Sequence, residues 1–293
     1  MNPDINSNTT LLGLLGHPVG HSRSPFIHNS LASYFGHDLV YLCFDVEPDD
    51  LAYAVRGGLS LGVKGFNVTV PHKQDVRLFL SGEDEDAGKV GAVNTLKRTE
   101  EGWYGYNTDL YGFMRSLDSD GIKLKDKNVV VLGAGGASRA IICAVLKCGA
   151  KKLVIFNRTY EKARALADEF GAAFKDTEVT SFATEAALLA AMDNDGGGWI
   201  AVNTTSLGMY PNTGEKLISD KKFYELCDTG VDIIFNPAKT AFMEAMEAGK
   251  EGNRAYNGLK MLLYQGLRSY EIWNDVSVPD DVAEDIYKKM KDM

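Results

Sequence analysis

The stretch 128-NVVVLGAGGASRA-140 decides the fold of this 293-residue chain, because an apolar strand passes through a glycine-rich turn directly into a helix. The pattern predicts the strand over residues 128–133 and the helix over residues 136–148. Glycines permit the tight turn and let backbone N–H groups approach a pyrophosphate at the helix N-terminus. The stretch therefore predicts a dinucleotide-binding loop, formed by Gly133, Ala134, Gly135, Gly136 and Ala137.

Ser138 departs from the common dinucleotide fingerprint, which has a third Gly or Ala at this place. A glycine-rich turn with only a structural role is the alternative interpretation. The position of the turn between an apolar strand and a helix favours cofactor binding.

The next strand, predicted over residues 152–157, indicates which dinucleotide is bound. An acidic residue about 20 positions after the loop would hydrogen-bond the ribose hydroxyls of NAD, and none is present. The strand leads instead into Asn157, Arg158 and Thr159, followed by Lys162. A guanidinium and an ammonium that flank a hydroxyl can bind the dianionic 2′-phosphate of NADP. Two cations at a helix start also oppose the helix dipole unless an anion binds there, so the sequence predicts NADP.

Strands and helices alternate on both sides of this unit. Downstream, the pattern predicts a helix at 160–170, strands at 199–203 and 230–235, and helices at 239–249, 258–273 and 280–291. Upstream, it predicts strands at 10–16, 39–46 and 65–70, helices that follow Ser24 as the N-cap, Pro48 and Pro71, and a hairpin within 91–107.

The length exceeds the roughly 100–200 residues of a typical domain, so two domains are expected. The chain is predicted to be an α/β protein with a cleft between its domains. Residues 1–108 are expected to form a mixed-sheet α/β substrate domain, and residues 109–257 a Rossmann-like, doubly wound parallel sheet that binds NADP. The helices at about 258–293 are expected to pack back on the first domain.

Composition excludes several classes of function. A net charge of −9 opposes binding to nucleic acid or to an anionic membrane. No apolar run approaches the roughly 18 residues of a membrane helix, and the polar start does not resemble a signal peptide, so a cytoplasmic protein is expected. Four scattered cysteines predict reduced thiols. His17 and His21 lie in a turn-forming stretch without a Cys or acidic partner, so no metal site is expected.

Small polar residues interrupt the apolar segments of the first domain. Strand alternation places Asn67 and Thr69 on one face, where they can line a pocket. Lys73 follows just beyond that strand, at the end where parallel sheets present their ligand sites. An isolated lysine would usually be a solvated surface charge.

The chain resembles the shikimate dehydrogenase family along nearly its entire length. The motifs that carry the resemblance occur in the order and at the spacing of the family: GHSRSP at 20–25, NVTVPHK at 67–73, GAVNT at 91–95, GYNTD at 105–109, GAGGASRA at 133–140, NRT at 157–159, NTTSLGM at 203–209, NPAKT at 236–240 and NGLKMLLYQG at 257–266. The resemblance implies NADPH-dependent, reversible reduction of 3-dehydroshikimate to shikimate, a step in the biosynthesis of aromatic amino acids.

The resemblance also implies roles for individual residues. Ser22 and Ser24 would hold the substrate carboxylate, and Lys73 with Asp109 would form the catalytic pair. The ring hydroxyls would be contacted by Thr69, Asn94, Asp109 and Gln265, with Asn67 lining the same pocket. Thr204, Ser206 and Gly258 lie in segments that match those around the nicotinamide.

Phe235 is a departure, because the family usually has Tyr there and the tyrosine hydroxyl reaches the substrate. The loss of one hydrogen bond near a charged group costs about 1.5 to 3 kcal/mol unless water or another donor replaces it. A core aromatic on the strand VDIIFNP is the alternative interpretation.

Two rival functions stay open at this point. A quinate/shikimate dehydrogenase would also oxidise quinate, often with NAD. A sensor that binds shikimate or NADP without catalysis could dispense with Lys73 or Asp109, yet both are present. The sequence does not decide the oligomeric state, and a homodimer is one alternative.

Overall fold

The computed structural model describes residues 5–293, which divide into two compact units. The first unit runs to Gly112 and also includes Leu262–Met293, and the second is Phe113–Met261. These boundaries lie four residues beyond those expected at 108 and 257. As a result Asp109 belongs to the first unit together with Lys73, and not to the second unit, where the sequence-based boundary placed it.

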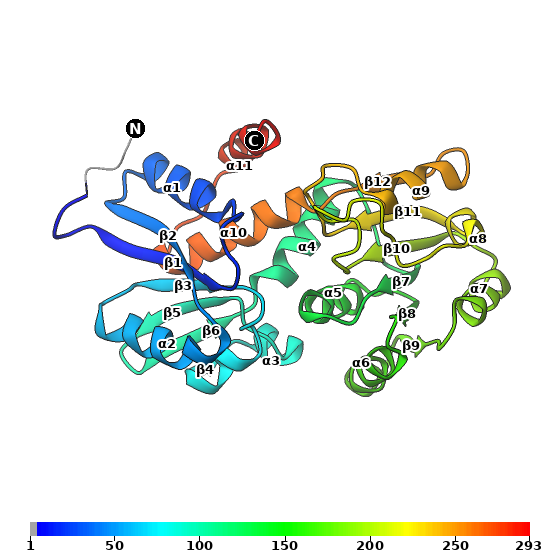
Figure 1. The fold of residues 1–293 in the computed structure, drawn as a ribbon, viewed down its shortest axis with the longest axis horizontal. Coiled ribbons are helices and arrows are strands. Elements are labelled where there is room, and N and C mark those ends of the chain that lie inside the picture. Colours follow the sequence, from blue (N-terminus) through cyan, green and yellow to red (C-terminus); the bar gives the residue numbers. More distant parts are fainter. Residues whose placement is uncertain (1–4) are drawn as a thin grey trace. The chain divides into compact units, whose positions relative to one another are not determined.

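The first unit contains a mixed six-stranded sheet with the order β2-β1-β3-β5-β6-β4 (Figure 1). Parallel pairs join β1 to β2 and β3, whereas β3, β5 and β6 are antiparallel neighbours and β4 pairs parallel with β6. The strands are β1 (Thr10–Gly16), β2 (Leu39–Asp45), β3 (Gly65–Val68), β4 (Leu80–Glu83), β5 (Thr95–Thr99) and β6 (Gly102–Tyr106). The mixed sheet and the hairpin expected within 91–107 are confirmed.

The helices of the first unit come from both ends of the chain. They are α1 (Ser24–Phe35), α2 (Leu51–Ser60), α3 (Glu85–Val90), α10 (Leu259–Asn274, in this unit from Leu262 on) and α11 (Asp280–Lys291), with short 3-10 turns at Pro48–Asp50 and Asp75–Phe79. Helix α4 (Thr108–Ser119) begins in the first unit. Its first turn therefore carries Asp109 beside the residues of that unit.

Two local expectations for the first unit were wrong. The N-cap of α1 is Arg23, and Ser24 is already its first helical residue. The stretch after Pro71 forms turns and a 3-10 helix, followed by strand β4 and helix α3, where one helix and a polar loop were expected. Helix α3 is short but capped, because the Asp84 side chain accepts a hydrogen bond from Ala87 N at 2.7 Å.

Helix α10 lies beside the strands of the first unit, as Figure 1 shows by its orange ribbon next to the blue and cyan strands. Trp273 is buried against Leu12 and Tyr41, and its indole N–H donates to Leu96 O at 2.8 Å. Gly65 on β3 permits this contact, since a Cβ there would overlap the indole and lie 2.7 Å from the Leu96 carbonyl oxygen.

The second unit contains an all-parallel sheet with the order β12-β11-β10-β7-β8-β9. Its strands are β7 (Asn128–Leu132), β8 (Lys152–Phe156), β9 (Glu178–Ser181), β10 (Trp199–Asn203), β11 (Cys227–Asp232) and β12 (Arg254–Tyr256). The chain reverses its direction of winding between β7 and β10. This is the doubly wound order of a Rossmann fold, in which ligands bind at the carboxyl ends of the central strands.

Helices cover this second sheet: α5 (Gly136–Lys147), α6 (Tyr160–Ala173), α7 (Glu185–Asn194), α8 (Lys221–Glu225) and α9 (Ala241–Gly249). Strand β11 ends at Asp232 and not at residue 235, so Phe235 lies in the loop that follows. The interpretation of Phe235 as a strand residue is therefore wrong. The apolar run IIF continues past the strand: in the loop, Ile234 is buried, and Ile233 and Phe235 are partly buried.

Residues 5–293 contain no helix that is long and apolar enough to cross a membrane. Within the same residues, no group of three or more His, Cys, Asp or Glu side chains could hold a metal ion. None of the four cysteines, all of which lie within residues 5–293, forms a disulfide bond, and Cys143 and Cys227 are buried.

We expect Gly65→Ala to lower the free energy of unfolding by about 1–3 kcal/mol, because the new methyl group displaces the Trp273 indole. Gly57→Ala is the control, since a Cβ on this α2 glycine meets no atom within 4 Å. That change should stabilise by up to about 1 kcal/mol. Urea unfolding followed by tryptophan fluorescence measures both, and equal shifts in the same direction would contradict the packing argument.

Candidate active site

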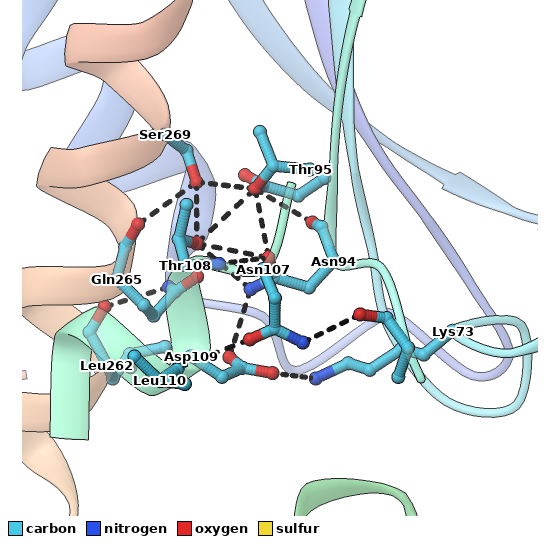
Figure 2. A network of polar contacts seen from close by, with 12 residues as sticks. Lys73, Asn94, Thr95, Asn107, Thr108, Asp109, Leu110, Leu262, Gln265 and Ser269 are labelled. Atoms are coloured by element: carbon cyan, nitrogen blue, oxygen red, sulfur yellow. Dashed lines mark hydrogen bonds and ion pairs between the residues drawn. The ribbon is translucent and has the colours of Figure 1, made fainter. Parts of the chain in front are cut away.

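The Lys73 ammonium and the Asp109 carboxylate form an ion pair in the first unit, with Nζ and Oδ2 2.6 Å apart (Figure 2). Only 14% of the lysine side chain and 10% of the aspartate side chain are exposed. Lys73 lies in the turn beyond β3, and its carbonyl accepts from Val93 N at 2.8 Å. The backbone thus ties the lysine to the GAVNT segment, which also carries Asn94.

Asn94 holds the other oxygen of Asp109. Its Nδ2 donates to Asp109 Oδ1 at 3.0 Å, and its Oδ1 accepts from the Thr108 backbone N–H at 2.7 Å. A backbone N–H can only donate, so it fixes which end of the Asn94 amide carries oxygen. The amide nitrogen must then face the carboxylate. Asp109 is therefore held at both oxygens, by a cation at one and by a neutral donor at the other.

Asn67 holds the backbone of Asn94, and its side chain is buried, with 4% exposed. Its Nδ2 lies 3.2 Å from Asn94 O, an acceptor, which places Asn67 Oδ1 toward Tyr41 Oη at 2.8 Å and His28 Nε2 at 3.1 Å. Burial lowers the pKa of His28 to about 3, so the ring is neutral and donates from Nε2. The polar atoms of Asn67 are thus engaged within the protein.

The remaining residues expected to bind substrate also lie in the first unit. Ser22 Oγ accepts from Ser24 N at 3.2 Å, which holds the two serines together. Thr69 packs against Gly16, where a Cβ would overlap its methyl group. Gln265 on α10 is 9% exposed and donates from Nε2 to Leu262 O at 2.8 Å.

In the second unit, the glycine-rich loop has the geometry that a pyrophosphate requires. Gly133 has φ of 115°, and a Cβ there would lie 2.6 Å from Thr204 Oγ1. Gly135 and Gly136 are exposed, and a Cβ on either meets no atom within 4 Å. Helix α5 begins at Gly136, and the first amides of an α-helix have no acceptor four residues back within the helix. The loop fits the phosphates of a dinucleotide.

Ser138, which departs from the common fingerprint, braces the loop. It is fully buried, and its hydroxyl accepts from Gly135 N at 2.9 Å and lies 2.7 Å from Thr204 Oγ1. Thr204 in turn donates to Leu132 O at 2.8 Å. Sequence reasoning missed this brace, because a serine in the first turn of a helix has no distinctive pattern. Thr204, expected at the cofactor, thus uses its hydroxyl within the protein.

Arg158, Thr159 and Lys162 are exposed at the carboxyl end of β8 and the start of α6. Thr159 is the N-cap of α6 but makes no side-chain capping bond, and Asn157 Nδ2 donates to Thr159 O at 2.9 Å. Within residues 5–293, neither Arg158 nor Lys162 has a carboxylate partner. The two cations are therefore available to a phosphate.

Gly258 and Ser206 have different surroundings. Gly258 is buried, its N–H donates to Ile234 O at 2.9 Å, and a Cβ would overlap the Ile233 carbonyl. Only glycine fits this close approach of two backbones. Ser206 is exposed in the turn that follows β10, and its carbonyl accepts from Met209 N at 3.1 Å.

Asp232 is a buried carboxylate that sequence reasoning did not single out. It accepts from Asn203 Nδ2 at 3.1 Å, Ile234 N at 3.0 Å and Thr240 Oγ1 at 2.6 Å. Burial raises its pKa, while the three donors oppose the rise. The side chain joins the ends of β10 and β11 to the start of α9.

Three family models match the chain. The shikimate dehydrogenase substrate binding domain matches residues 14–96, the shikimate/quinate 5-dehydrogenase domain 116–193, and the shikimate 5′-dehydrogenase C-terminal domain 258–286. A curated protein of Methanococcus aeolicus named shikimate dehydrogenase (NADP(+)) is 41% identical over 94% of this chain and 95% of its own length.

Solved structures agree with these matches. A crystal structure of a shikimate dehydrogenase in complex with NADP+ has a TM-score of 0.85 and 37% identity, covering 98% of this chain and 97% of its own. The Thermus thermophilus shikimate 5-dehydrogenase in complex with NADP(H) and shikimate has a TM-score of 0.81 and 29% identity, covering 96% and 99%. On these similarities in sequence and in both units of the fold, the chain belongs to the shikimate dehydrogenase family.

Proposed function

We propose that this chain is an NADP-dependent shikimate dehydrogenase, which reduces 3-dehydroshikimate reversibly to shikimate in the biosynthesis of aromatic amino acids. The observation that carries the proposal is the ion pair of 2.6 Å between Lys73 and Asp109. A nearly buried lysine with a carboxylate partner is suited to stabilise charge and to exchange a proton. The relatives with known names act with the same cofactor.

The chemistry requires a proton donor for the carbonyl oxygen in addition to a hydride donor for its carbon. NADPH supplies the hydride to the C3 carbonyl, and an alkoxide develops on the substrate oxygen. Lys73 Nζ offers a cation and N–H donors to this oxygen. Asp109 holds the ammonium through Oδ2 and can accept a hydrogen bond from a substrate hydroxyl. We assign the two residues jointly as the acid/base dyad.

The same proposal gives roles to the other polar residues. Ser22 and Ser24 bind the carboxylate, consistent with their shared hydrogen bond. Thr69, Asn94, Asp109 and Gln265 contact the ring hydroxyls. Asn67 lines the same pocket, and its Nδ2 keeps Asn94 in place by donating to the Asn94 backbone carbonyl.

For the cofactor, we assign the 2′-phosphate to Arg158, Thr159 and Lys162, with Asn157 ordering the turn. The pyrophosphate lies on the loop 133–137 at the start of α5. Thr204, Ser206 and Gly258 belong to the segments next to the nicotinamide. Their fixed backbone is consistent with that role.

We place the enzyme in the cytoplasm, with a homodimer as one alternative for its assembly. A rival assignment as a quinate/shikimate dehydrogenase differs in the substrate that fits the pocket and in the use of NAD. Steady-state rates with shikimate and with quinate, each with NADP+ and NAD+, distinguish the two. A protein that only senses shikimate or NADP would give no shikimate-dependent formation of NADPH.

Lys73→Ala is expected to lower turnover by on the order of 10²-fold or more, because the dyad loses its cation and proton donor. The dissociation constant of NADPH should stay unchanged. Lys97→Ala is the control, since Lys97 pairs with Asp275 in the same unit and is not assigned to the site. Near-normal turnover of Lys73→Ala would overturn the assignment.

Arg158→Ala is expected to raise the KM for NADP+ by about 10- to 100-fold, as one charged hydrogen-bonding partner of the 2′-phosphate is lost. The KM for NAD+, which lacks this phosphate, should change little. Arg164→Ala on α6, the helix that follows Arg158, is the control, because that exposed arginine lies near Asp168. Equal changes for both cofactors would contradict a phosphate clamp.

Phe235→Tyr is expected to lower the KM for shikimate by about 10-fold or more, by restoring a hydroxyl that the family usually has at this place. The KM for NADP+ serves as the internal control and should not change. An unchanged KM for shikimate would mean that water or another donor already takes the place of this hydroxyl.

A further inference from the structure

Ser269, on the face of α10 that meets the network in Figure 2, has four polar neighbours and is fully buried. Its Oγ lies 3.0 Å from Gln265 O, 2.9 Å from Asn67 Nδ2, 2.9 Å from Thr95 Oγ1 and 3.1 Å from Thr108 Oγ1. None of these contacts is to Lys73 or Asp109. Three of the four neighbours, Asn67, Thr95 and Thr108, are themselves hydrogen-bonded to Asn94.

The hydrogen-bond directions around Ser269 can be assigned. A carbonyl oxygen only accepts, so the single hydroxyl hydrogen of Ser269 goes to Gln265 O. An amide nitrogen only donates, and Asn67 Nδ2 has three acceptors within reach: Ser269 Oγ at 2.9 Å, Thr95 Oγ1 at 3.1 Å and Asn94 O at 3.2 Å. We assign one of its two hydrogens to Ser269 Oγ, the nearest of the three. One lone pair of the serine oxygen then remains for a threonine hydroxyl.

Ser269 Oγ is needed as an acceptor because the side-chain oxygen of Asn94 cannot accept from all the donors around it. Asn94 Oδ1 already accepts from Thr108 N, and both threonine hydroxyls lie 3.1 Å from it. With two lone pairs it accepts from only one of them. The other threonine hydroxyl needs a different acceptor. Ser269 Oγ lies 2.9 Å from Thr95 Oγ1 and 3.1 Å from Thr108 Oγ1, whereas the two threonine oxygens lie 3.3 Å from each other. Ser269 Oγ is therefore the acceptor for that hydroxyl.

We propose that Ser269 is a positioning residue for the Lys73–Asp109 dyad. Its Oγ accepts the hydrogen of the threonine hydroxyl that does not donate to Asn94 Oδ1. The Asn94 amide therefore stays with its nitrogen toward Asp109 Oδ1. The inference rests on the proposed catalytic function of the dyad. It adds a residue of α10 that acts through Thr95, Thr108 and Asn94 without touching the reacting atoms.

The first test is Ser269→Ala. Without the hydroxyl, one threonine hydrogen loses its acceptor and competes for Asn94 Oδ1, so Asp109 is held less firmly. We expect kcat with shikimate and NADP+ to fall about 10-fold, as for a misplaced catalytic group. The KM for NADP+ should stay within about twofold of the wild-type value, as expected when an interaction is lost mainly in the transition state.

Ser116→Ala is the matched control. Ser116 is also a buried helical serine, 6% exposed, and its hydroxyl donates to Phe113 O at 2.7 Å within α4. Both variants lose a serine-to-carbonyl bond inside a helix, and both are expected to lower the melting temperature. Only Ser269→Ala should lower kcat, and equal losses of kcat would overturn the proposal.

A double-mutant cycle with Asp109→Asn tests the route of the effect. If Ser269 acts through Asp109, Ser269→Ala in the Asp109→Asn background causes little further loss of kcat. A further 10-fold loss in the double variant would show an independent effect and overturn the proposal. The pH profile of kcat should also shift in Ser269→Ala and not in Ser116→Ala, since it reports the protonation of the dyad.

The positioning role of Ser269 can be tested even if the proposed function is wrong. A wild-type protein that forms no NADPH from shikimate and NADP+ would overturn the function itself. The position of the dyad is then judged from crystal structures of the wild type and Ser269→Ala. A contact between Asn94 Nδ2 and Asp109 Oδ1 that lengthens beyond hydrogen-bonding distance supports the inference, and an unchanged contact of about 3.0 Å refutes it.

Discussion

The constraint on which the site depends is the burial of one ammonium and one carboxylate. A charge removed from water is costly unless a partner and further hydrogen bonds compensate it. Lys73 satisfies one oxygen of Asp109 and Asn94 the other, and each of these two residues is held by the backbone of a neighbouring segment.

The hydrogen bonds beneath the pair have defined directions because several of their members can only donate or only accept. The Thr108 amide fixes Asn94, and the Asn94 carbonyl fixes Asn67. Asn67 then leaves His28 with only one role, that of a neutral donor. Fixed donor and acceptor roles of this kind let buried side chains hold a reactive group in place without themselves taking part in the reaction.

Much of this could be predicted from the sequence. The strand and glycine-rich turn before α5 indicated the Rossmann sheet, and the basic residues at 158 and 162 indicated NADP, because those patterns are local. Short elements such as β4 and α3 were missed, since four to six residues carry too little periodicity. The roles of Ser138, Asp232 and Ser269 were missed for another reason. Each role depends on a partner far away in the chain, such as Thr204 for Ser138. The sequence near each residue contains no pattern that predicts such a partner.

The place of α10 in the first unit has a consequence for how the protein is made. The sheet that surrounds Lys73 is complete in sequence by Tyr106, yet the indole that packs on it and the serine that completes its polar network come more than 160 residues later, at 273 and 269. During synthesis, the whole second unit emerges from the ribosome before these residues do, and domains tend to fold as they emerge. The Lys73–Asp109 pair therefore acquires its final support only after the second unit has emerged, so the second unit can be folded before the first is.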